Sequence, residues 1–409
     1  MSHYKSDLMR VLDERGYIHQ TTDAEGLDAL ACEGVVPGYI GFDATAPSLH
    51  IGNLVSIMML RRLQQAGHRP IVVMGGGTTK VGDPSGKDES RKLLDHAAIG
   101  ANISSIRTVF ERLLRFDDSA TGAVMVDNDE WLSDLGYIDL LRNVGPHFTV
   151  NRMLTFDSVQ LRLEREQPLT FLEFNYMILQ AYDFRELAQR YGCRLQMGGS
   201  DQWGNIVNGM ELARRMDGSE LFGLTTPLLT TADGAKMGKT AAGAVWLNEA
   251  QLPAYDFWQY WRNVDDRDVG RFLRLFTDLP LGEIAELESR DGAAINDAKI
   301  VLANEVTRLV RGDEAARLAE KTAHETFAGK GAGEDLPSLS LGEEGMRVGA
   351  ALTALGFTAS NGEAKRKIAE GAVRLDDRVL SDPGEVLLLD QDEEARLSLG
   401  KKKHAILRR

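Results

Sequence analysis

The sequence has few cysteines and no long apolar run. Only Cys32 and Cys193 occur among its 409 residues, and their separation fits neither a disulfide framework nor a CxxC metal or redox motif. Its apolar runs stay far below the ~18 residues that a membrane span needs. The N-terminal segment is charged throughout and lacks the apolar core of a signal peptide. We therefore expect a cytoplasmic protein without a membrane partner, outside the secreted and fibrous classes.

Basic residues are also in deficit, with 47 Lys and Arg against 61 Asp and Glu and a net charge of −14. An acidic surface repels phosphate, so the total charge alone argues against a nucleic-acid partner. The deficit is uneven, however, because residues 345–409 hold 12 basic and 10 acidic side chains and end in KKKHAILRR. Such a tail fits a solvated terminus or an RNA-binding surface, and charge does not decide between them.

Length and pattern predict three domains and a linker. Residues 27–75 read as strand, helix and strand, which implies a right-handed parallel crossover and a doubly wound α/β fold. We expect a Rossmann-like parallel sheet with a helical insertion over residues 1–248, an α-helical domain over 249–327, a Gly/Ser/Pro-containing linker over 328–344 and a small α+β domain over 345–409. Ligands of such sheets bind beyond the carboxyl ends of the strands.

Several familiar catalytic templates are missing. The segment GDPSGK at residues 82–87 is one residue short of a P-loop, and Asp88 stands where that motif has Ser or Thr. The glycines at 75–77 do not form GxGxxG, and HExxH, GxSxG and Cys/His clusters are absent, so we expect no protein metal site. Lys87 and Arg91 present two cations on one helical face, which either is solvated or binds phosphate.

Two short motifs have residues suited to phosphate. HIGN, at 50–53, lies where a strand-end loop enters a helix, and free N–H groups beside a small Gly52 favour an anion there. The alternative is a cap at Ser48 next to an incidental histidine. KMGKT, at 236–240, places two lysines in a glycine loop that can follow charge developing during phosphoryl transfer. The alternative is a lysine-bearing surface turn.

A third pattern places polar groups on an apolar helix. Tyr176, Gln180 and Asp183 fall at i, i+4 and i+7, hence on one helical face. They either line a polar pocket or form the solvent face of an amphipathic helix. Asp201 and Gln202 follow in the glycine loop GGSDQWGN, where a carboxylate can bind ribose hydroxyls.

In combination these segments resemble the class I aminoacyl-tRNA synthetases. HIGN and KMGKT are similar to the HIGH and KMSKS signatures of that class. The segments GYIGFDATAPSLHIGN, GDPSGK, YMILQAYDF and GGSDQWGN are similar to those of bacterial tyrosyl-tRNA synthetases, and residues 345–409 resemble the S4-type RNA-binding domain of that family. Two positions depart from the pattern: Asn53 replaces the second histidine of HIGH, and Ile40 stands near the ribose where some relatives have a small polar residue.

The resemblance implies a two-step reaction. The carboxylate of tyrosine attacks the α-phosphate of ATP, giving tyrosyl-adenylate and pyrophosphate, and the tyrosyl group then moves to the 3′-terminal adenosine of tRNA(Tyr). The implied partners are L-tyrosine, ATP with its Mg²⁺, tRNA(Tyr) and a second copy in a homodimer, with residues 142–153 near the interface. The alternatives are a tryptophanyl-tRNA synthetase, an inactive S4 RNA-binding protein and a nucleotide hydrolase.

The same resemblance assigns the site residues by position. Catalysis without a covalent enzyme intermediate would rest on charge stabilisation by His50, Thr45, Lys87, Arg91, Lys236 and Lys239. Tyrosine would be held by Tyr39, Asp83, Tyr176, Gln180, Asp183 and Gln202. Tyr39 and Asp183 would bind the phenolic hydroxyl and leave phenylalanine unmatched, a discrimination for which this enzyme family is itself the standard example. The nucleotide would contact Gly41, Asp43, Gly52, Asn53, Gly199, Asp201 and Lys239. RNA would contact Lys365, Arg366, Lys367, Arg374, Lys401, Lys402 and Lys403.

Overall fold

The structure is a computed structural model that forms two compact units. It describes residues 2–83, 94–235, 237–240, 243–290, 292–327, 336–342, 345–376, 378–390, 394–400 and 403–409. The first unit comprises Met1–Lys236 and Arg267–Ser289, and the second comprises Met237–Asp266 and Arg290–Arg409. Compactness thus groups residues 267–289 with the N-terminal part of the chain. The functional domain limits at 248, 327 and 344 stay a prediction.

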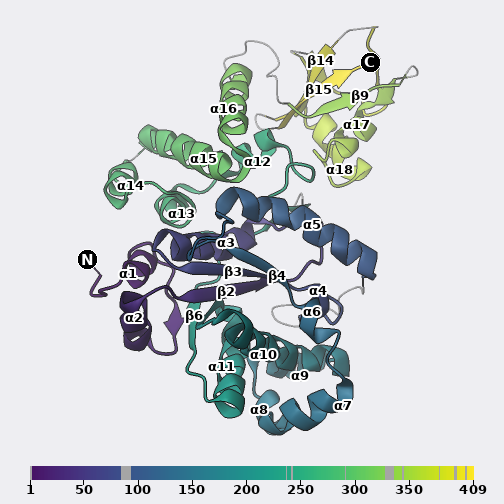
Figure 1. Ribbon diagram of the computed structural model, residues 1–409. Coiled ribbons are helices and arrows are strands. Elements are labelled where there is room, and N and C mark those ends of the chain that lie inside the picture. Colours follow the sequence, from purple (N-terminus) through teal and green to yellow (C-terminus); the bar gives the residue numbers. More distant parts are fainter. Residues whose placement is uncertain are drawn as a thin grey trace. The chain divides into compact units, whose positions relative to one another are not determined.

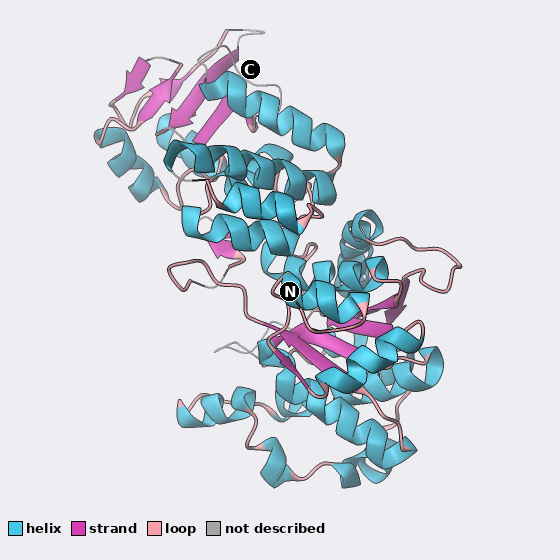
Figure 2. Cartoon of the chain, turned by 90° about the vertical axis from the view of Figure 1, so that its left-hand side faces the viewer, coloured by secondary structure: helices cyan, strands magenta, loops and turns pink. Residues whose placement is uncertain are grey.

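A six-stranded sheet forms the centre of the first unit (Figure 2). Its strands follow the order β1-β6-β5-β2-β3-β4, and all neighbours pair in parallel except the short β1, which is antiparallel to β6. The strands are β1 (Gln20–Thr21), β2 (Pro37–Phe42), β3 (Arg69–Met74), β4 (Val124–Asp127), β5 (Leu195–Gly199) and β6 (Phe222–Thr226). The chain passes from β2 outward to β3 and β4, then returns to β5 on the other side of β2. The strand order therefore reverses between β2 and β5, where such folds bind ligands.

The crossover from β2 to β3 confirms the expected doubly wound α/β fold. Helix α3 (Ile51–Gln65) connects the two strands and is followed by Gly67, whose positive φ of 86° lets the chain leave the helix. Ile71 and Val73 of β3 are fully buried. Continuous apolar sequence suits a parallel strand because helices cover both faces of the sheet.

Helices lie on both faces of this sheet (Figure 1). One face carries α3 and α5 (His96–Leu113), and the other carries α10 (Phe171–Tyr191) and α11 (Trp203–Asp217). Smaller helices connect β4 to α10, in the position of the expected helical insertion. The other α-helices that the structure describes in this unit are α1 (Asp7–Glu14), α2 (Ala24–Glu33), α4 (Gly76–Thr79), α6 (Asp129–Leu132), α7 (Tyr137–Asp139), α8 (Val150–Met153), α9 (Asp157–Glu164), α13 (Val269–Phe276) and α14 (Leu281–Glu288).

Ion pairs attach the α13–α14 segment to α3. Asp278 accepts from Arg61 Nε at 3.1 Å and from Arg62 Nη1 at 2.6 Å, and Arg62 is almost completely buried. Burial alone would raise the pKa of Asp278, but the two guanidinium groups hold that pKa well below its usual range. Arg15 adds donated hydrogen bonds to three carbonyls of the same segment. These contacts explain why residues 267–289 belong to the first compact unit.

The second unit combines a helical part with a small sheet. Helices α12 (Ala254–Arg262), α15 (Ile295–Arg311) and α16 (Asp313–Phe327) pack together, and Phe257, Trp258 and Trp261 of α12 are buried in their core. The sheet follows the order β12-β11-β14-β15-β9 beside α17 (Val348–Ala354) and α18 (Asn361–Ala369). Its strands are β9 (Ser338–Ser340), β11 (Val373–Leu375), β12 (Arg378–Leu380), β14 (Glu394–Leu399) and β15 (Lys403–Arg408). Two further pairs of short strands lie outside this sheet. They are β7 (Lys239–Thr240) with β8 (Gly243–Ala244), and β10 (Met346–Arg347) with β13 (Val386–Leu387).

The basic C-terminus is part of this sheet. Strand β15 pairs antiparallel with β14 and parallel with β9, and its Ala405 and Leu407 are buried in the core of the unit. The alternative of a merely solvated terminus is therefore wrong for 403–408. In the described ranges, no helix has both the length and the apolar content needed to cross a membrane.

Candidate active site

The predicted binding residues gather where β2 and β5 end. Asp43 follows the last residue of β2, and Asp201 lies just beyond the end of β5. A Cβ atom added at Gly41 would meet open space, whereas one added at Gly199 would lie 2.6 Å from Oδ1 of Asp201. Glycine at 199 therefore lets the exposed Asp201 carboxylate fold back over the end of β5.

His50 is the N-terminal cap of α3. Its Nδ1 accepts a hydrogen bond from the Gly52 N–H at 3.0 Å, and Asn53 Oδ1 accepts from the His50 N–H at 3.2 Å. The proposed alternative of a cap at Ser48 is wrong, because the Ser48 hydroxyl donates to the Leu49 carbonyl instead. Since Nδ1 accepts, a neutral His50 ring carries its proton on Nε2. The start of α3 thus combines a helix N-terminus with a donor suited to an anion.

The polar stripe of α10 faces the strand ends. Tyr176 and Asp183 are buried, so the solvent-face alternative for this stripe is wrong. The Tyr176 hydroxyl donates to Oδ2 of Asp43 at 3.2 Å, and the Thr78 hydroxyl donates to Oδ1 of the same carboxylate at 2.8 Å. Asp43 therefore links the end of β2 to α10 and to α4.

A chain of amides continues this polar surface. Gln180 Nε2 donates to Gln202 Oε1 at 3.2 Å, and Gln202 Nε2 donates to Asp83 Oδ2 at 3.2 Å. Asn205, on the first turn of α11, donates to Gln180 Oε1 at 2.8 Å and to Gln202 Oε1 at 3.3 Å. The structure thus brings together four residues from three segments that are far apart in the sequence.

Asp183 is a carboxyl group that is almost completely buried. It is 3% exposed and accepts hydrogen bonds from Asn128 Nδ2 at 2.9 Å and from Trp131 Nε1 at 2.8 Å. Burial raises the pKa of Asp183 to about 7, and the two donated hydrogen bonds oppose this rise. A carboxyl group poised near neutral pH is a frequent feature of ligand-binding and catalytic sites.

Tyr39 lies in the same apolar cluster as Trp131 and Phe184. It is 1% exposed, and its ring contacts that of Phe184 edge-on with 5.2 Å between the centroids. Its hydroxyl is buried, and no described residue forms a hydrogen bond with it. Burial, followed by the charge of Asp183, raises the pKa of Tyr39 well above its usual value. Tyr39 therefore stays protonated, and its buried hydroxyl offers a donor and an acceptor that no described residue uses.

Sequence comparisons identify the family to which this site belongs. Residues 34–328 match the family model for class I tRNA synthetases specific for tryptophan and tyrosine. The tyrosine–tRNA ligase of Novosphingobium aromaticivorans is 69% identical over 409 residues, covering 100% of both chains. That of Rhodospirillum rubrum is 59% identical over 99% of this chain and 98% of its own. The chain belongs to the bacterial tyrosine–tRNA ligases.

Solved structures of the family have the same architecture. A C-terminally truncated mitochondrial tyrosyl-tRNA synthetase from Aspergillus nidulans superposes with a TM-score of 0.71 at 28% identity, covering 78% of this chain and 94% of that chain. The corresponding enzyme from Coccidioides posadasii gives a TM-score of 0.67 at 32% identity, covering 78% and 92%. The chain is therefore a class I aminoacyl-tRNA synthetase, and its function is to charge tRNA with tyrosine through activation by ATP.

Some predicted residues of this ligase fall outside the strand-end cluster. Thr45 is exposed in the loop between β2 and α3. Lys87, Arg91 and Lys236 lie outside the described residues, as does the side chain of Lys239. The roles of all predicted site residues stay a prediction, because the family match identifies the enzyme without assigning its side chains.

The predicted RNA-binding residues of the ligase have different environments. Lys365 and Arg366 on α18 and Arg374 on β11 are exposed. Lys367 instead pairs with Glu370 at 2.8 Å, and Lys403 Nζ donates to the Phe357 carbonyl at 2.7 Å and lies over that ring. Lys401 and Lys402 lie outside the described residues.

Sequence reasoning missed four residues of the ligase site: Thr78, Asn128, Trp131 and Asn205. A usable signal existed for Asn128 and Trp131, since they lie within four residues of the end of β4 and strand ends of a parallel sheet bind ligands. Asn205 belongs to the quoted GGSDQWGN segment, but its contacts cross to α10, and sequence spacing does not reveal such a partner.

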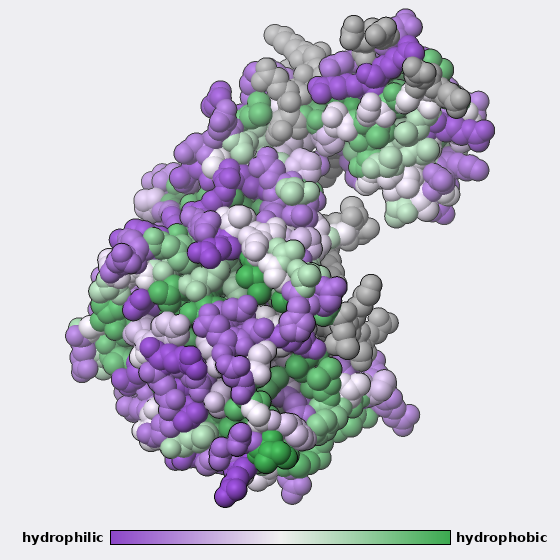
Figure 3. All heavy atoms as spheres, turned by 45° about the vertical axis from the view of Figure 1, so that its right-hand side comes forward, coloured by the Kyte–Doolittle hydropathy of each residue, from purple (hydrophilic) through white to green (hydrophobic). Residues whose placement is uncertain are grey.

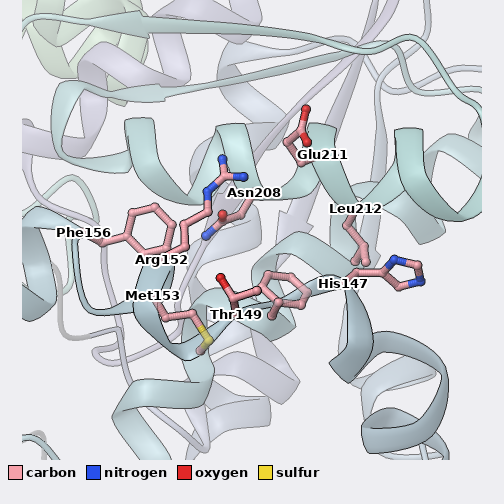
Figure 4. Close-up of a pocket in the computed structure, with 9 residues that line it drawn as sticks. His147, Thr149, Arg152, Met153, Phe156, Asn208, Glu211 and Leu212 are labelled. Carbon is pink, nitrogen blue, oxygen red and sulfur yellow. The ribbon is translucent and has the colours of Figure 1, made fainter.

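A separate hollow lies on the side of α11 beyond this site (Figure 4). Arg152 and Asn208 border it together with apolar walls that include Phe156 and Met153. Asn208 is buried, and its Nδ2 has no hydrogen-bond partner among the described residues. None of the residues predicted to bind tyrosine or ATP lines this hollow.

Proposed function

We propose that Asp183 and Tyr39 select L-tyrosine by its phenolic hydroxyl. The observation that carries this proposal is the buried Tyr39 hydroxyl, which has no hydrogen-bond partner among the described residues and interacts electrostatically with Asp183, a carboxyl group whose pKa is raised to about 7. Unpaired buried polar groups cost free energy, which a ligand hydroxyl recovers by donating to Asp183 and accepting from Tyr39. Phenylalanine offers neither contact and leaves both groups unpaired.

The other end of the amino acid has matching groups on the amide chain. An α-ammonium group requires acceptors, which Asp83, Tyr176 and Gln180 supply. The carboxylate requires donors. Gln202 contacts both Gln180 and Asp83, and its Nε2 group has a second hydrogen that can donate to the carboxylate. The amino acid therefore binds with its reactive carboxylate toward the strand ends, near Asp43 and α3.

The α-phosphate of ATP binds at the N-terminus of α3 in this proposal. His50 donates from Nε2 to a phosphate oxygen, and the donor interaction strengthens as charge develops during attack by the tyrosine carboxylate. Lys87, Arg91, Lys236 and Lys239 neutralise the departing pyrophosphate, and Thr45 contacts the phosphates. Asn53, Gly41, Gly52, Gly199 and Asp201 surround the nucleoside. Both steps depend on positioning and charge stabilisation without a covalent enzyme intermediate.

Mg²⁺ accompanies ATP in this proposal. Within the described residues, no group of three His, Cys, Asp or Glu side chains converges as a metal cage would. Mg²⁺ commonly retains water and binds through substrate phosphates with few protein ligands. The residues present therefore fit an ion carried by the nucleotide, which supplies charge neutralisation at the phosphates.

ATP–pyrophosphate exchange tests the amino-acid assignment directly. The assay is run with tyrosine, tryptophan and phenylalanine in parallel, and we expect exchange with tyrosine alone. Exchange that is driven by tryptophan would keep the fold and reject the phenol-binding pocket. If folded protein supported no exchange with any of them, activation itself would be rejected and the RNA-binding alternative favoured.

The ligase forms a homodimer through an apolar surface of the first unit. Ile138 and Val150 are 70% and 61% exposed, and further large apolar side chains are exposed nearby in sequence. Apolar surface is visible on this part of the molecule (Figure 3). Large exposed patches of this kind mark protein–protein interfaces. The exposed set within residues 137–172 is Tyr137, Ile138, Leu141, Val150, Leu154, Leu161, Leu163, Phe171 and Leu172.

The tRNA partner binds the S4-like C-terminal part through exposed cations on α18 and β11. Lys365, Arg366 and Arg374 are the predicted residues that present their charges to solvent. Backbone phosphates of tRNA supply the complementary charge, although the whole chain is acidic. The cytoplasm is the proposed location, because tRNA is charged for translation there and because the cysteines Cys32 and Cys193 are both free thiols.

A further inference from the structure

Asn205 occupies an unusual place between two glutamines of the proposed tyrosine site. It is 8% exposed on the first turn of α11, and its Nδ2 group donates to Gln180 Oε1 at 2.8 Å and to Gln202 Oε1 at 3.3 Å. One NH₂ group therefore meets two amide oxygens. The two glutamines come from different segments, α10 and the turn before α11.

This contact matches the orientation of the two glutamine amides, which is anchored by Asp83, because its carboxylate accepts from Gln202 Nε2 and leaves Gln202 Oε1 for Asn205. With both oxygens directed at Asn205, Gln180 Nε2 donates to Gln202 Oε1 at 3.2 Å and Gln202 Nε2 donates to Asp83 Oδ2 at 3.2 Å. A rotation of either amide by 180° would exchange its oxygen and nitrogen with little change in shape. Such a rotation would place N–H against N–H at Asn205 and lose the bonds shown here.

We propose that Asn205 is a positioning residue that determines whether the oxygen or the nitrogen of the Gln180 and Gln202 amides faces the bound tyrosine. This inference rests on the proposed function, in which Gln180 contacts the α-ammonium group and Gln202 the carboxylate region. The second lone pair of Gln180 Oε1 then accepts from the ammonium group, and Gln202 presents N–H to the carboxylate. With the amides reversed, a donor would face the ammonium group and an acceptor would face the carboxylate, and both contacts would be repulsive.

A purely structural role for Asn205 makes a different prediction. If the residue only fills space between α10 and α11, then isosteric side chains should replace it better than alanine. If its donors set the amide polarity, then an isosteric acceptor should be worse than alanine, because a carboxylate at this position attracts the N–H ends of both glutamines. Asn205→Asp tests the acceptor, and Asn205→Leu separates the two roles, because it keeps the volume without a donor or a charge: it should retain activity under the structural role and lose as much as Asn205→Ala under the positioning role.

The experiment measures tyrosine-dependent ATP–pyrophosphate exchange for the full chain. We expect kcat/KM for tyrosine to fall by about tenfold in Asn205→Ala and by about a hundredfold in Asn205→Asp, with KM for ATP unchanged. The matched control is Asn208→Ala, one turn further along α11, whose Nδ2 group has no hydrogen-bond partner among the described residues. It should retain kcat/KM for tyrosine.

Two outcomes overturn the inference while the proposed function stands. One is a wild-type enzyme that exchanges with tyrosine together with an Asn205→Asp variant that is as active as Asn205→Ala or more active. The other is a change in KM for ATP equal to that for tyrosine. If thermal unfolding shows that Asn205→Asp does not fold, Asn205→Leu replaces it as the test, because leucine retains the volume without a donor. A fall in kcat/KM for tyrosine as large as in Asn205→Ala supports the inference. Wild-type activity of Asn205→Leu overturns it. Absence of exchange in the wild type instead rejects the proposed function.

Discussion

Trp131 donates its indole N–H to Asp183 at 2.8 Å in a site where neither side chain meets solvent to a significant degree. Asn128 Nδ2 donates to the other carboxylate oxygen of Asp183 at 2.9 Å. Together they hold the carboxyl plane in one orientation while leaving lone pairs for a ligand. The orientation of the proposed phenol acceptor is thus determined by α6 and the end of β4.

Removal of the indole donor should weaken tyrosine selection. In Trp131→Phe, Asp183 keeps its burial but loses one hydrogen bond to a charged acceptor, worth about 1.5–3 kcal/mol. We expect KM for tyrosine to rise by roughly tenfold or more in pyrophosphate exchange, with KM for ATP unchanged. An unchanged KM for tyrosine would show that Trp131 does not orient the acceptor.

The pH dependence of tyrosine binding should report Asp183. Its pKa is raised to about 7, so in the free enzyme its acceptor charge appears as pH rises through about 7. We expect kcat/KM for tyrosine to increase across that range and the inflection to vanish in Asp183→Asn. The same profile in wild type and variant would assign the inflection to another group.

The raised pKa of Asp183 also makes the free energy of unfolding depend on pH. Between the ordinary pKa of 3.8 and about 7 the folded state keeps the Asp183 proton while the unfolded state loses it. The contribution of this group to the free energy of unfolding is therefore fully present below the ordinary pKa and lost as pH rises toward 7. The free energies of unfolding of wild type and Asp183→Asn, measured by urea unfolding, should become similar at the acid end of this range.

The sequence predicted the sheet and the general place of the site for clear physical reasons. Apolar strand, amphipathic helix and glycine stop are local signals, and β2, α3 and β3 appear where those signals lie. Parallel connectivity then places the ends of β2 and β5 together, so Asp43 and Asp201 come to the same edge of the sheet without any knowledge of side-chain contacts.

What sequence could not supply were contacts between distant segments. The cap formed by His50 depends on a ring nitrogen, and histidine is not among the side chains that usually cap helices. Asn205 and Trp131 act on residues 25 and 52 positions away, a separation at which periodicity carries no information. The charged tail likewise became a strand because β9 and β14 offer it partners.

Charge on the apolar surface of the first unit should separate the subunits. Ile138→Glu and Val150→Glu place carboxylates on positions that a dimer would bury, and unpaired buried charges are strongly unfavourable. Sedimentation velocity should show a monomer for the double variant and a dimer for the wild type. Val35→Glu, another exposed apolar position outside residues 137–172, serves as the control and should stay dimeric.

Reversal of exposed charges on α18 should weaken tRNA charging alone. Lys365→Glu and Arg366→Glu remove two of the proposed phosphate contacts, so KM for tRNA should rise several-fold and the slope of log K against log salt should become shallower by about 2. Pyrophosphate exchange should not change, because it needs no tRNA. Arg107→Glu, an exposed cation of α5 in the first unit, is the control. An unaltered KM for tRNA would exclude α18 from the RNA interface.

His50 has two separable tasks, since Nδ1 caps α3 and Nε2 is the proposed phosphate donor. Alanine at 50 removes both, whereas asparagine is a good helix cap that cannot place a donor at the Nε2 position. We expect His50→Ala to lose about 1 kcal/mol of unfolding free energy and His50→Asn to recover most of it. Both should slow adenylate formation by about 10²-fold or more in single-turnover experiments, as is typical when one donor to developing charge is removed. If asparagine restored the rate as well as the stability, the cap would be the whole function of His50 and the phosphate assignment would be wrong.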